Sequence, residues 1–226
     1  HQAIPGGGGV GFVLYNDDMG GAIKQTGIEL TGAYSVLLSN QDAVSFGLSM
    51  RGNQFVFDGT GLNVWQTGDQ SLPQTIESTF GVDFNAGMMV YGKHYYFGMS
   101  VYNLLEDKLN LSGVDDDANR MFRHYNFMAS YLYKVTQLFS LQPSALMRMT
   151  EATPGQLDFH LRAIYNGTYW AGMGLRPQDA FVIGTGVNYG AFTLAYNYDT
   201  TLGDNYLSAH SHELSFGYFL PVRSAF

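Results

Sequence analysis

The chain has 226 residues, of which 46% are apolar, 15% aromatic and only 13% charged, with 28 glycines, 6 prolines and no cysteine. Average soluble domains carry roughly 25% charged residues and about 7% glycine, and the aromatic content of this chain excludes a disordered segment. The lack of cysteine excludes disulfides, thiol nucleophiles and thiolate metal sites, while a net charge of −8 with only 11 Lys and Arg disfavours a nucleic-acid binder.

The hydropathy of the chain does not predict a transmembrane helix. No apolar stretch reaches the ~18 to 20 residues that such a helix needs. A membrane β-barrel instead spreads its apolar residues over alternate positions of many short strands. The mean hydropathy of −0.07 fits such a barrel and also fits a soluble β protein. Because residues 1–9 lack a signal pattern, we expect that a leader has been removed or that the chain begins part-way through a longer protein.

Alternation of apolar with polar or small residues, which is the period of a half-buried β-strand, recurs along the chain. The clearest case is 80–90, where every even-numbered residue is apolar and Asp83, Asn85 and Gly87 lie between them. In chain order we predict about twelve strands and no helix: 10–14, 28–38, 44–50, 80–90, 95–101, 127–135, 141–149, 157–165, 169–175, 181–189, 192–198 and 214–220.

The connections between these strands alternate in length. Short connections lie at 39–42, 92–93, 134–137, 166–167 and 190, and long ones at 16–25, 58–79, 104–124, 150–156, 176–179 and 200–211. Outer-membrane barrels have tight periplasmic turns and long external loops in this order. We therefore predict an all-β fold: a transmembrane antiparallel up-and-down β-barrel of about 12 strands, a single outer-membrane domain over residues 1–226 with both termini in the periplasm.

The two faces of the predicted strands differ in composition. The apolar face carries tyrosines at or near strand ends, as an aromatic girdle at the lipid headgroups requires: Tyr95, Tyr133, Tyr165, Tyr169, Tyr189, Tyr198 and Tyr218. The opposite face mixes small polar residues with Glu29, Arg51, Asp83, Arg148, Asp158, Arg162 and Glu213. We expect outer-membrane lipids to contact the first face and the second face to line a narrow, partly filled lumen.

Several stretches carry a family resemblance. They are 9–20, which contains Asn16-Asp17-Asp18; 43–57, with Arg51-Gly52-Asn53; 92–104; and 194–199 followed by 211–218. In this order they resemble the PorP/SprF family, outer-membrane proteins of the type IX secretion system of Bacteroidota. Members usually carry about two more strands before these stretches, so the resemblance implies about 14 strands if an N-terminal section is missing.

The resemblance implies a non-enzymatic part of the type IX secretion and gliding machinery that has no cofactor. It implies contacts with the periplasmic ring lipoprotein and associated secretion proteins, and help in delivering or attaching a secreted cargo or adhesin at the surface. An outer-membrane porin or small-hydrophobic-substrate channel is the alternative. A barrel lipase or protease would need a triad or carboxylate dyad, and we identify neither in the sequence.

Two predicted loops carry candidate binding residues. Asp115, Asp116 and Asp117 offer the oxygen ligands that calcium prefers, but their spacing is not that of an EF-hand, and we interpret them as an acidic solvated loop. Leu62, Val64 and Trp65 are apolar groups in a predicted external loop. They predict either a partner-binding surface or a plug over the barrel mouth. We include the three aspartates in the predicted partner-binding surface.

Asp158, His160 and Arg162 alternate along one predicted strand, so we expect them to form a network in the lumen. His210 and His212 with Glu213 have no third ligand in a recognisable pattern, and we interpret them as structural loop histidines. Asn16, Asp17 and Asp18 are expected to form a turn, because Asn and Asp bond their own backbone. No cofactor or metal site is predicted beyond the aspartate run.

Overall fold

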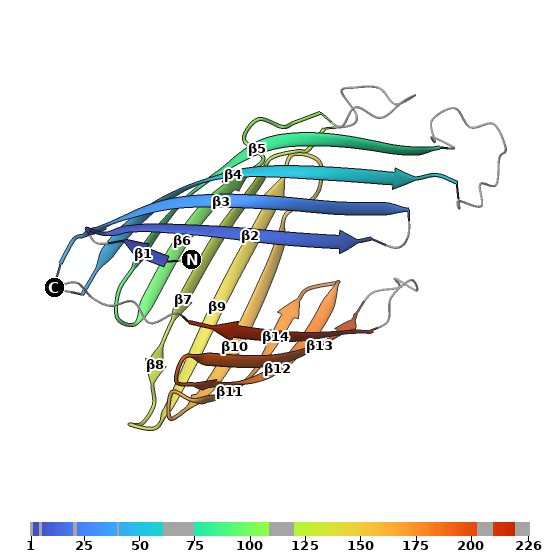
Figure 1. Cartoon of the computed structure of the whole chain (residues 1–226). Helices are drawn as coiled ribbons and strands as arrows, with labels where there is room; N and C mark the ends of the chain where they lie inside the picture. The colour runs from blue at the N-terminus through green and yellow to red at the C-terminus, as the bar shows by residue number, and fades with distance from the viewer. Residues whose placement is uncertain are drawn as a thin grey trace.

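The computed structural model describes residues 2–4, 6–19, 22–39, 41–60, 75–108, 120–202 and 210–219. Every regular element in these ranges is a β-strand. The strands, drawn in Figure 1, are β1 (Gln2–Ile4), β2 (Gly8–Asp18), β3 (Ile23–Leu37), β4 (Ala43–Asp58), β5 (Ile76–Tyr91), β6 (Tyr95–Tyr102), β7 (His124–Tyr131), β8 (Tyr133–Lys134), β9 (Phe139–Thr150), β10 (Gln156–Tyr165), β11 (Tyr169–Arg176), β12 (Ala180–Tyr189), β13 (Phe192–Thr201) and β14 (His210–Tyr218). The same ranges contain no helix that is long and apolar enough to cross a membrane, a finding that concerns helices alone.

The strands form one antiparallel up-and-down sheet in the order β1-β2-β3-β4-β5-β6-β7-β9-β10-β11-β12-β13-β14. The two-residue β8 follows β7 after Leu132 and pairs with the same neighbour, β9. Apart from the short β1 and β8, the described strands number twelve, which confirms the predicted strand total and topology. The predicted strand 127–135 is interrupted at Leu132, whose amide donates instead to the His94 carbonyl at 2.6 Å.

The three longest connections, 59–75, 103–123 and 202–209, all lie at one end of the sheet. The opposite end, the turn end, carries 38–42, 92–94, 135–138, 166–168 and 190–191. The end with the three longest connections, the loop end, carries 19–22, 59–75, 103–123, 151–155, 177–179 and 202–209. The start of β2 and the finish of β14 both lie at the turn end, because Gly8 pairs with Tyr34 and Tyr218 with Phe192.

Side chains on the two faces invert the usual arrangement of a folded protein. The outer face exposes large apolar side chains such as Leu48 (57%) and Leu214 (74%). Among the described residues, the buried apolar ones are only Ala43 and Ala180, and the buried polar ones are Ser49, Asn53, Asp83, Asn85, Asn103, Ser130 and Asp158. Such a surface is unfavourable in water and favourable in a bilayer, as expected of the lipid-contacting face of an outer-membrane barrel.

A ring of exposed tyrosines marks the turn end of the outer face. Tyr95, Tyr133, Tyr165, Tyr169, Tyr189 and Tyr218 all lie at strand termini next to the short turns and are 41–77% exposed. Tyrosine prefers the headgroup level because its ring is apolar and its hydroxyl is polar. Tyr198, predicted for the same girdle, lies toward the loop end on β13.

The strands differ greatly in length, which makes one side of the sheet taller. β3, β4 and β5 have 15, 16 and 16 residues, whereas β6 and β7 have 8 each. β5 pairs with β6 only from Ala86 to Tyr91, so residues 76–85 of β5 extend past β6 at the loop end. We call β3–β5 the tall wall (Figure 1).

The predicted turn at Asn16, Asp17 and Asp18 is wrong. These residues belong to β2 and pair with Thr26, Gln25 and Lys24 of β3, and the connection lies at 19–22. The Thr26 hydroxyl donates to Asn16 at 3.1 Å, and Lys24 lies 3.5 Å from Asp18. Because these cross-strand contacts satisfy the polar side chains, they support strand pairing instead of a turn.

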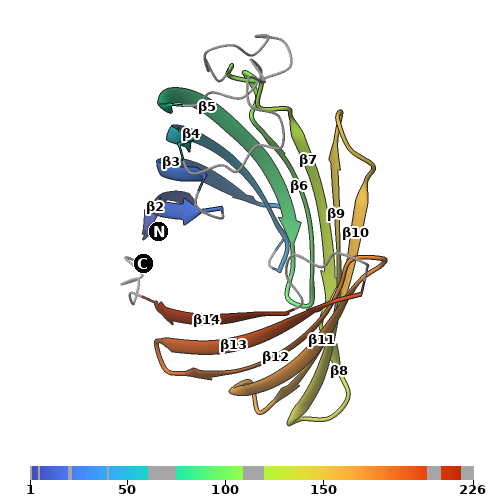
Figure 2. The same cartoon turned by 90° about the vertical axis from the view of Figure 1, so that its right-hand side faces the viewer.

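The sheet curls around a central space, and Figure 2 shows β2 and β14 facing each other across it. Within the described residues, β14 pairs with β13 alone, and β2 is paired on its other side only where β1 lies beside Gly8–Val10. The fold is therefore a barrel-shaped sheet whose inner face encloses the polar side chains.

Candidate functional site

The inner face of the barrel carries the candidate functional site, because the buried polar and charged side chains of the described residues gather there. Three features occupy the inner face. A segment following β6 folds onto β4 and β5, two cavities lie at different heights, and an ionic cluster joins β9, β10 and β11.

The first feature is the inner segment, which we define as residues 103–108 and 120–123. The Asp83 carboxylate on β5 accepts hydrogen bonds from the backbone amides of Leu105 (2.9 Å) and Asp107 (3.3 Å). Asp83 is only 1% exposed, and a buried carboxylate needs such donors. Gly81 lies two residues before Asp83 on the same face of β5 and leaves room for the Asp107 side chain. A Cβ at Gly81 would collide with the carboxylate of Asp107.

Side chains on β4 and β5 hold the start of the inner segment. Arg51 donates to the side-chain oxygens of Asn103 and, at 3.5 Å, of Asn85. Asn85 in turn accepts from the Asn103 backbone amide at 3.2 Å and donates to Glu29 at 3.2 Å. Asn103 has a φ of 57°, a left-handed conformation that asparagine tolerates. The chain therefore turns inward directly after β6.

The two halves of the inner segment also bind each other. Asn103 donates to the Phe122 carbonyl at 3.0 Å, and Arg123 donates to the Leu104 carbonyl through Nε and Nη2. Glu106 lies 3.6 Å from Arg123 and 3.7 Å from Arg120. These contacts fix residues 120–123 beside 103–106 on the inner face.

A cavity of about 580 Å³, the mouth cavity, lies beside the inner segment at the loop end. Its lining includes Gln25 of β3, Arg51 of β4, Tyr102 of β6, His124 of β7 and Thr150 of β9. Residues 120–122 supply a further wall. The cavity is therefore bounded by the tall wall on one side and by β7 and β9 on the other.

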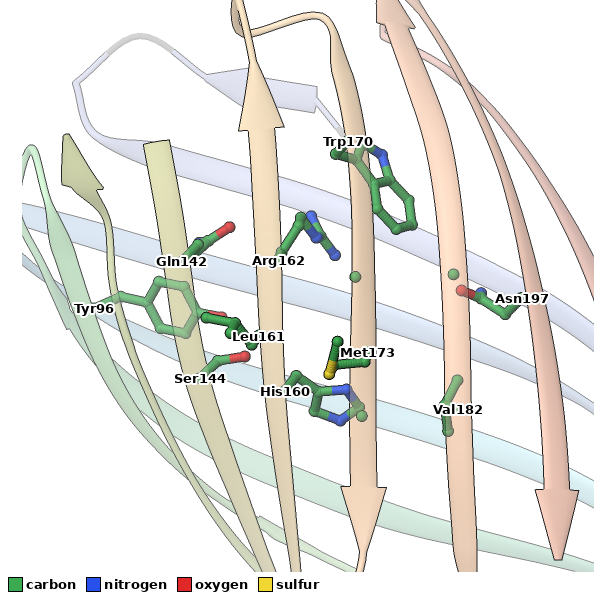
Figure 3. Close-up of a pocket in the computed structure, with 13 residues that line it drawn as sticks. Tyr96, Gln142, Ser144, His160, Leu161, Arg162, Trp170, Met173, Val182 and Asn197 are labelled. Atoms are coloured by element: carbon green, nitrogen blue, oxygen red, sulfur yellow. The ribbon is translucent and has the colours of Figure 1, made fainter. Parts of the chain in front are cut away.

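A second cavity of about 260 Å³, the middle cavity, lies on the inner face of β9–β13 (Figure 3). The Arg162 guanidinium carbon stands 4.3 Å from the centre of the Trp170 ring, a cation–π arrangement. Glycines on neighbouring strands lie beneath these side chains. A Cβ at Gly186 would stand 2.6 Å from the Trp170 ring, and one at Gly174 would stand 2.5 Å from His160 Nδ1. His160 and Trp170 therefore lie flat against the sheet.

The ionic cluster centres on Asp158 of β10, which is 3% exposed. Arg148 of β9 donates to one carboxylate oxygen, and Arg176 of β11 donates to the other at 3.2 Å. Arg176 also donates to Asp179 at 3.0 Å, and Gln156 donates to Asp179 at 3.1 Å. Two arginines thus neutralise a carboxylate that burial would otherwise destabilise.

The predicted lumen residues divide between two places. Asp158, His160 and Arg162 share the inner face of β10, but Asp158 belongs to the ionic cluster while His160 and Arg162 line the middle cavity. Within the described part of the chain, no hydrogen bond or ion pair joins Asp158 to the other two residues. A single network of the three stays a prediction.

Other predicted site residues lie elsewhere. Leu62, Val64, Trp65, Asp115, Asp116 and Asp117 fall outside the described residues. Asp58 lies at the loop-end tip of β4, shortly before Leu62, Val64 and Trp65 in the sequence. Its carboxylate accepts hydrogen bonds from the hydroxyl and the backbone amide of Thr60. These two bonds, of which the hydroxyl bond has the larger effect, lower the pKa of the Asp58 carboxyl.

The predicted loop histidines are in fact strand residues of β14. His212 Nδ1 lies 2.7 Å from the Tyr196 hydroxyl and His210 Nδ1 lies 2.9 Å from the Tyr198 hydroxyl, so each histidine has a partner on β13. Glu213, the residue after His212, points to the other face. The described ranges hold no group of three or more His, Asp or Glu residues placed to bind a metal ion.

The sequence interpretation missed the inner segment and Arg176. Asn103, Leu105 and Asp107 fall at or in a predicted long loop, where no period marks a position as inward. The sequence does mark the residues that bind this segment. Arg51 and Asp83 are charged residues on strand faces that are otherwise rich in glycine and serine.

A family model, described as "Type IX secretion system membrane protein PorP/SprF", matches residues 2–218. The chain belongs to the PorP/SprF family. This family membership confirms the resemblance seen in the sequence and makes the protein a membrane component of a type IX secretion system. Together with the apolar outer face, it points to the outer membrane, and the family is one of secretion components, not of known enzymes.

The other comparisons add little to the assignment of this PorP/SprF protein. No curated protein matches the chain. A crystal structure of a Pseudomonas aeruginosa FadL homologue is similar with a TM-score of 0.47 at 10% sequence identity, covering 95% of this chain and 73% of that one.

Proposed function

We propose that this barrel is a non-enzymatic outer-membrane component of the type IX secretion and gliding machinery that joins periplasmic ring proteins to surface cargo. The family match over residues 2–218 is the observation that carries this proposal. The gathering of the three longest connections at one end supports a division of labour, in which the short turns of the other end bind the periplasmic ring lipoprotein and its partner and the long loops bind a secreted cargo or adhesin.

The proposed orientation puts the turn end, and with it the start of β2 and the finish of β14, in the periplasm. The tyrosine ring supports this arrangement, because it leaves only short turns beyond one headgroup layer. Residues 1–226 then form a single barrel domain. Protease added to intact cells should cleave a site inserted at 153–154 and spare one inserted at 166–167.

Co-purification from native outer membranes tests the proposed role. A tagged chain extracted in mild detergent should retain the periplasmic ring lipoprotein and a secreted protein. An insertion at the turn 166–167 should release the ring lipoprotein, and a matched insertion at the loop 153–154 should not. Recovery of the chain as a lone monomer, or equal loss in both variants, would contradict the proposal.

The two inner-face cavities favour a second candidate function, a small-solute or hydrophobic-substrate channel. The inner segment opposes an open pore, since it occupies the inner face beside the mouth cavity. Planar-bilayer recordings separate the candidates. The anchoring role predicts a silent barrel, whereas steady conductance from the purified chain would favour the channel.

A further inference from the structure

The lining of the mouth cavity combines positive charge with aromatic walls. Arg51 and Arg120 contribute guanidinium groups and His124 contributes an imidazole, while Phe55, Tyr102 and Phe122 contribute aromatic rings. None of the described residues that line the cavity is Asp or Glu. This composition is opposite in sign to the chain as a whole, whose net charge is −8.

Some hydrogen-bond donors of the side chains that line the mouth cavity have no acceptor among the described residues. Arg51 donates through Nη2 to Asn103 and Asn85, but its Nε is buried and has no hydrogen-bond partner among the described residues. Arg120 shares Glu106 with Arg123 at a distance of 3.7 Å. The imidazole of His124 is exposed to the cavity and has no hydrogen bond within the described ranges. A buried donor without an acceptor is destabilising unless water or a ligand supplies one.

The carboxylates near the cavity do not accept hydrogen bonds from these unpaired donors. Asp83 is already bound by the backbone amides of Leu105 and Asp107, and Glu29 accepts a hydrogen bond from Asn85. Glu106 lies within ion-pair distance of Arg120 and Arg123, in both cases through Oε2, and its Oε1 is buried with no hydrogen-bond partner among the described residues. Among the described residues, the lining of the cavity therefore offers nitrogen donors and includes no carboxylate.

We propose that the mouth cavity binds a small organic anion, a carboxylate carried on an aromatic body. The guanidinium groups of Arg51 and Arg120 supply the forked donors that carboxylates accept. The rings of Tyr102 and Phe122 already lie next to these guanidinium carbons, at 5.8 and 4.9 Å, and offer flat faces for the aromatic body. A volume of about 580 Å³ is within the ~300–1,000 Å³ range of small-molecule sites. This inference goes beyond the role in secretion and does not depend on it.

Calorimetric titration of the purified full-length chain in detergent tests the proposal, with benzoate as the probe. Benzamide has nearly the same shape without the charge, and inorganic phosphate has charge without the ring. Benzoate should bind, and both comparison ligands should bind at least ~10-fold more weakly, the factor expected when a charge-assisted hydrogen bond is lost. Equal binding of benzamide would overturn the role of charge, and equal binding of phosphate would overturn the role of the rings.

Variants locate the site. Arg120→Gln and His124→Gln should each weaken benzoate binding, with the arginine change causing a loss of ~10-fold or more. Arg51→Gln should do the same, but it also removes a contact to Asn103, so Arg120→Gln is the decisive variant. Arg162→Gln, which changes the middle cavity, should leave the affinity unchanged. No benzoate binding at millimolar concentration, or a loss confined to Arg162→Gln, would overturn the proposal. Because no partner protein is present, failure here is distinguishable from failure of the secretion role.

Discussion

Asp83 holds Leu105 in place across 22 positions of the chain, with 2.9 Å between the carboxylate oxygen and the backbone amide nitrogen. The contact joins the middle of a long strand to a segment that leaves the sheet. It explains how a buried carboxylate is tolerated on the inner face, and it identifies the residue on which the position of the inner segment most depends.

Asp83→Ala should loosen the inner segment and leave the rest of the barrel folded. The amides of Leu105 and Asp107 would lose their acceptor, at a cost of about 1–3 kcal/mol for an unsatisfied buried group. Hydrogen exchange measured by mass spectrometry should therefore be at least ~10-fold faster across 103–108. Glu151→Gln, in an exposed connection, is the control and should not change these rates. Unaltered exchange in Asp83→Ala would show that the segment is held by other contacts.

Asp158 and Asp179 both bind Arg176 but should differ in their effect on stability. Asp158→Ala leaves two arginines without their buried partner and should lower the free energy of unfolding by about 3 kcal/mol. Asp179 has a side chain that is 49% exposed, so Asp179→Ala should cost only about 0.2–1 kcal/mol. Urea unfolding in lipid vesicles measures both. Similar losses in the two variants would contradict the assigned roles.

Gly186→Ala should disturb the middle cavity because the new Cβ would stand 2.6 Å from the Trp170 ring and 2.7 Å from the Leu194 carbonyl oxygen. Overpacking of this kind costs about 1–3 kcal/mol. Gly32→Ala is the matched control, since its Cβ meets nothing within 4 Å. Tryptophan emission in a Trp65→Phe background should shift for the first variant only. A shift in both, or in neither, would speak against the flat packing of Trp170.

Leu194 and Thr193 are neighbours on β13 that point to opposite faces. Leu194 is 46% exposed on the outer face near the turn end, so Leu194→Arg should destabilise the barrel in vesicles, by less than the about 2–4 kcal/mol that such a charge costs at the bilayer midplane. Thr193→Arg places the same charge in the lumen, where it loses only the 3.0 Å bond to Asn188 and should have a smaller effect. Unfolding curves in one lipid composition compare them directly. The reverse order of stabilities would overturn the assignment of faces.

The period-two pattern predicted most of the fold because each strand has one lipid face. The predicted strands 95–101 and 181–189 compare with Tyr95–Tyr102 and Ala180–Tyr189 in the structure. The pattern failed to predict the strand ends that carry polar residues, because apolar and polar residues do not alternate there. At the far ends of β2 and β3, polar residues such as Asn16 and Lys24 continue the pairing, and nothing in their composition distinguishes a polar strand from a turn.

The candidate site was predictable only in part. Period two placed Arg51, Asp83 and Asp158 on the inner face, because a charge among small residues stands out against the apolar alternation. Their partners were not predictable, since Asp83 binds backbone amides that every residue possesses. The contact of Arg51 with Asn103 spans 52 positions, and only the tertiary fold brings these residues together.

The unequal strand lengths give the barrel a stepped rim. At ~3.3 Å per residue, strands of 15–16 residues measure about 50 Å and strands of 8 residues about 26 Å. One side of the loop end therefore rises well above the other. The mouth cavity is lined on one side by β3 and β4 and on the other by β6, β7 and β9, so a molecule that enters it from the loop end meets walls of unequal height.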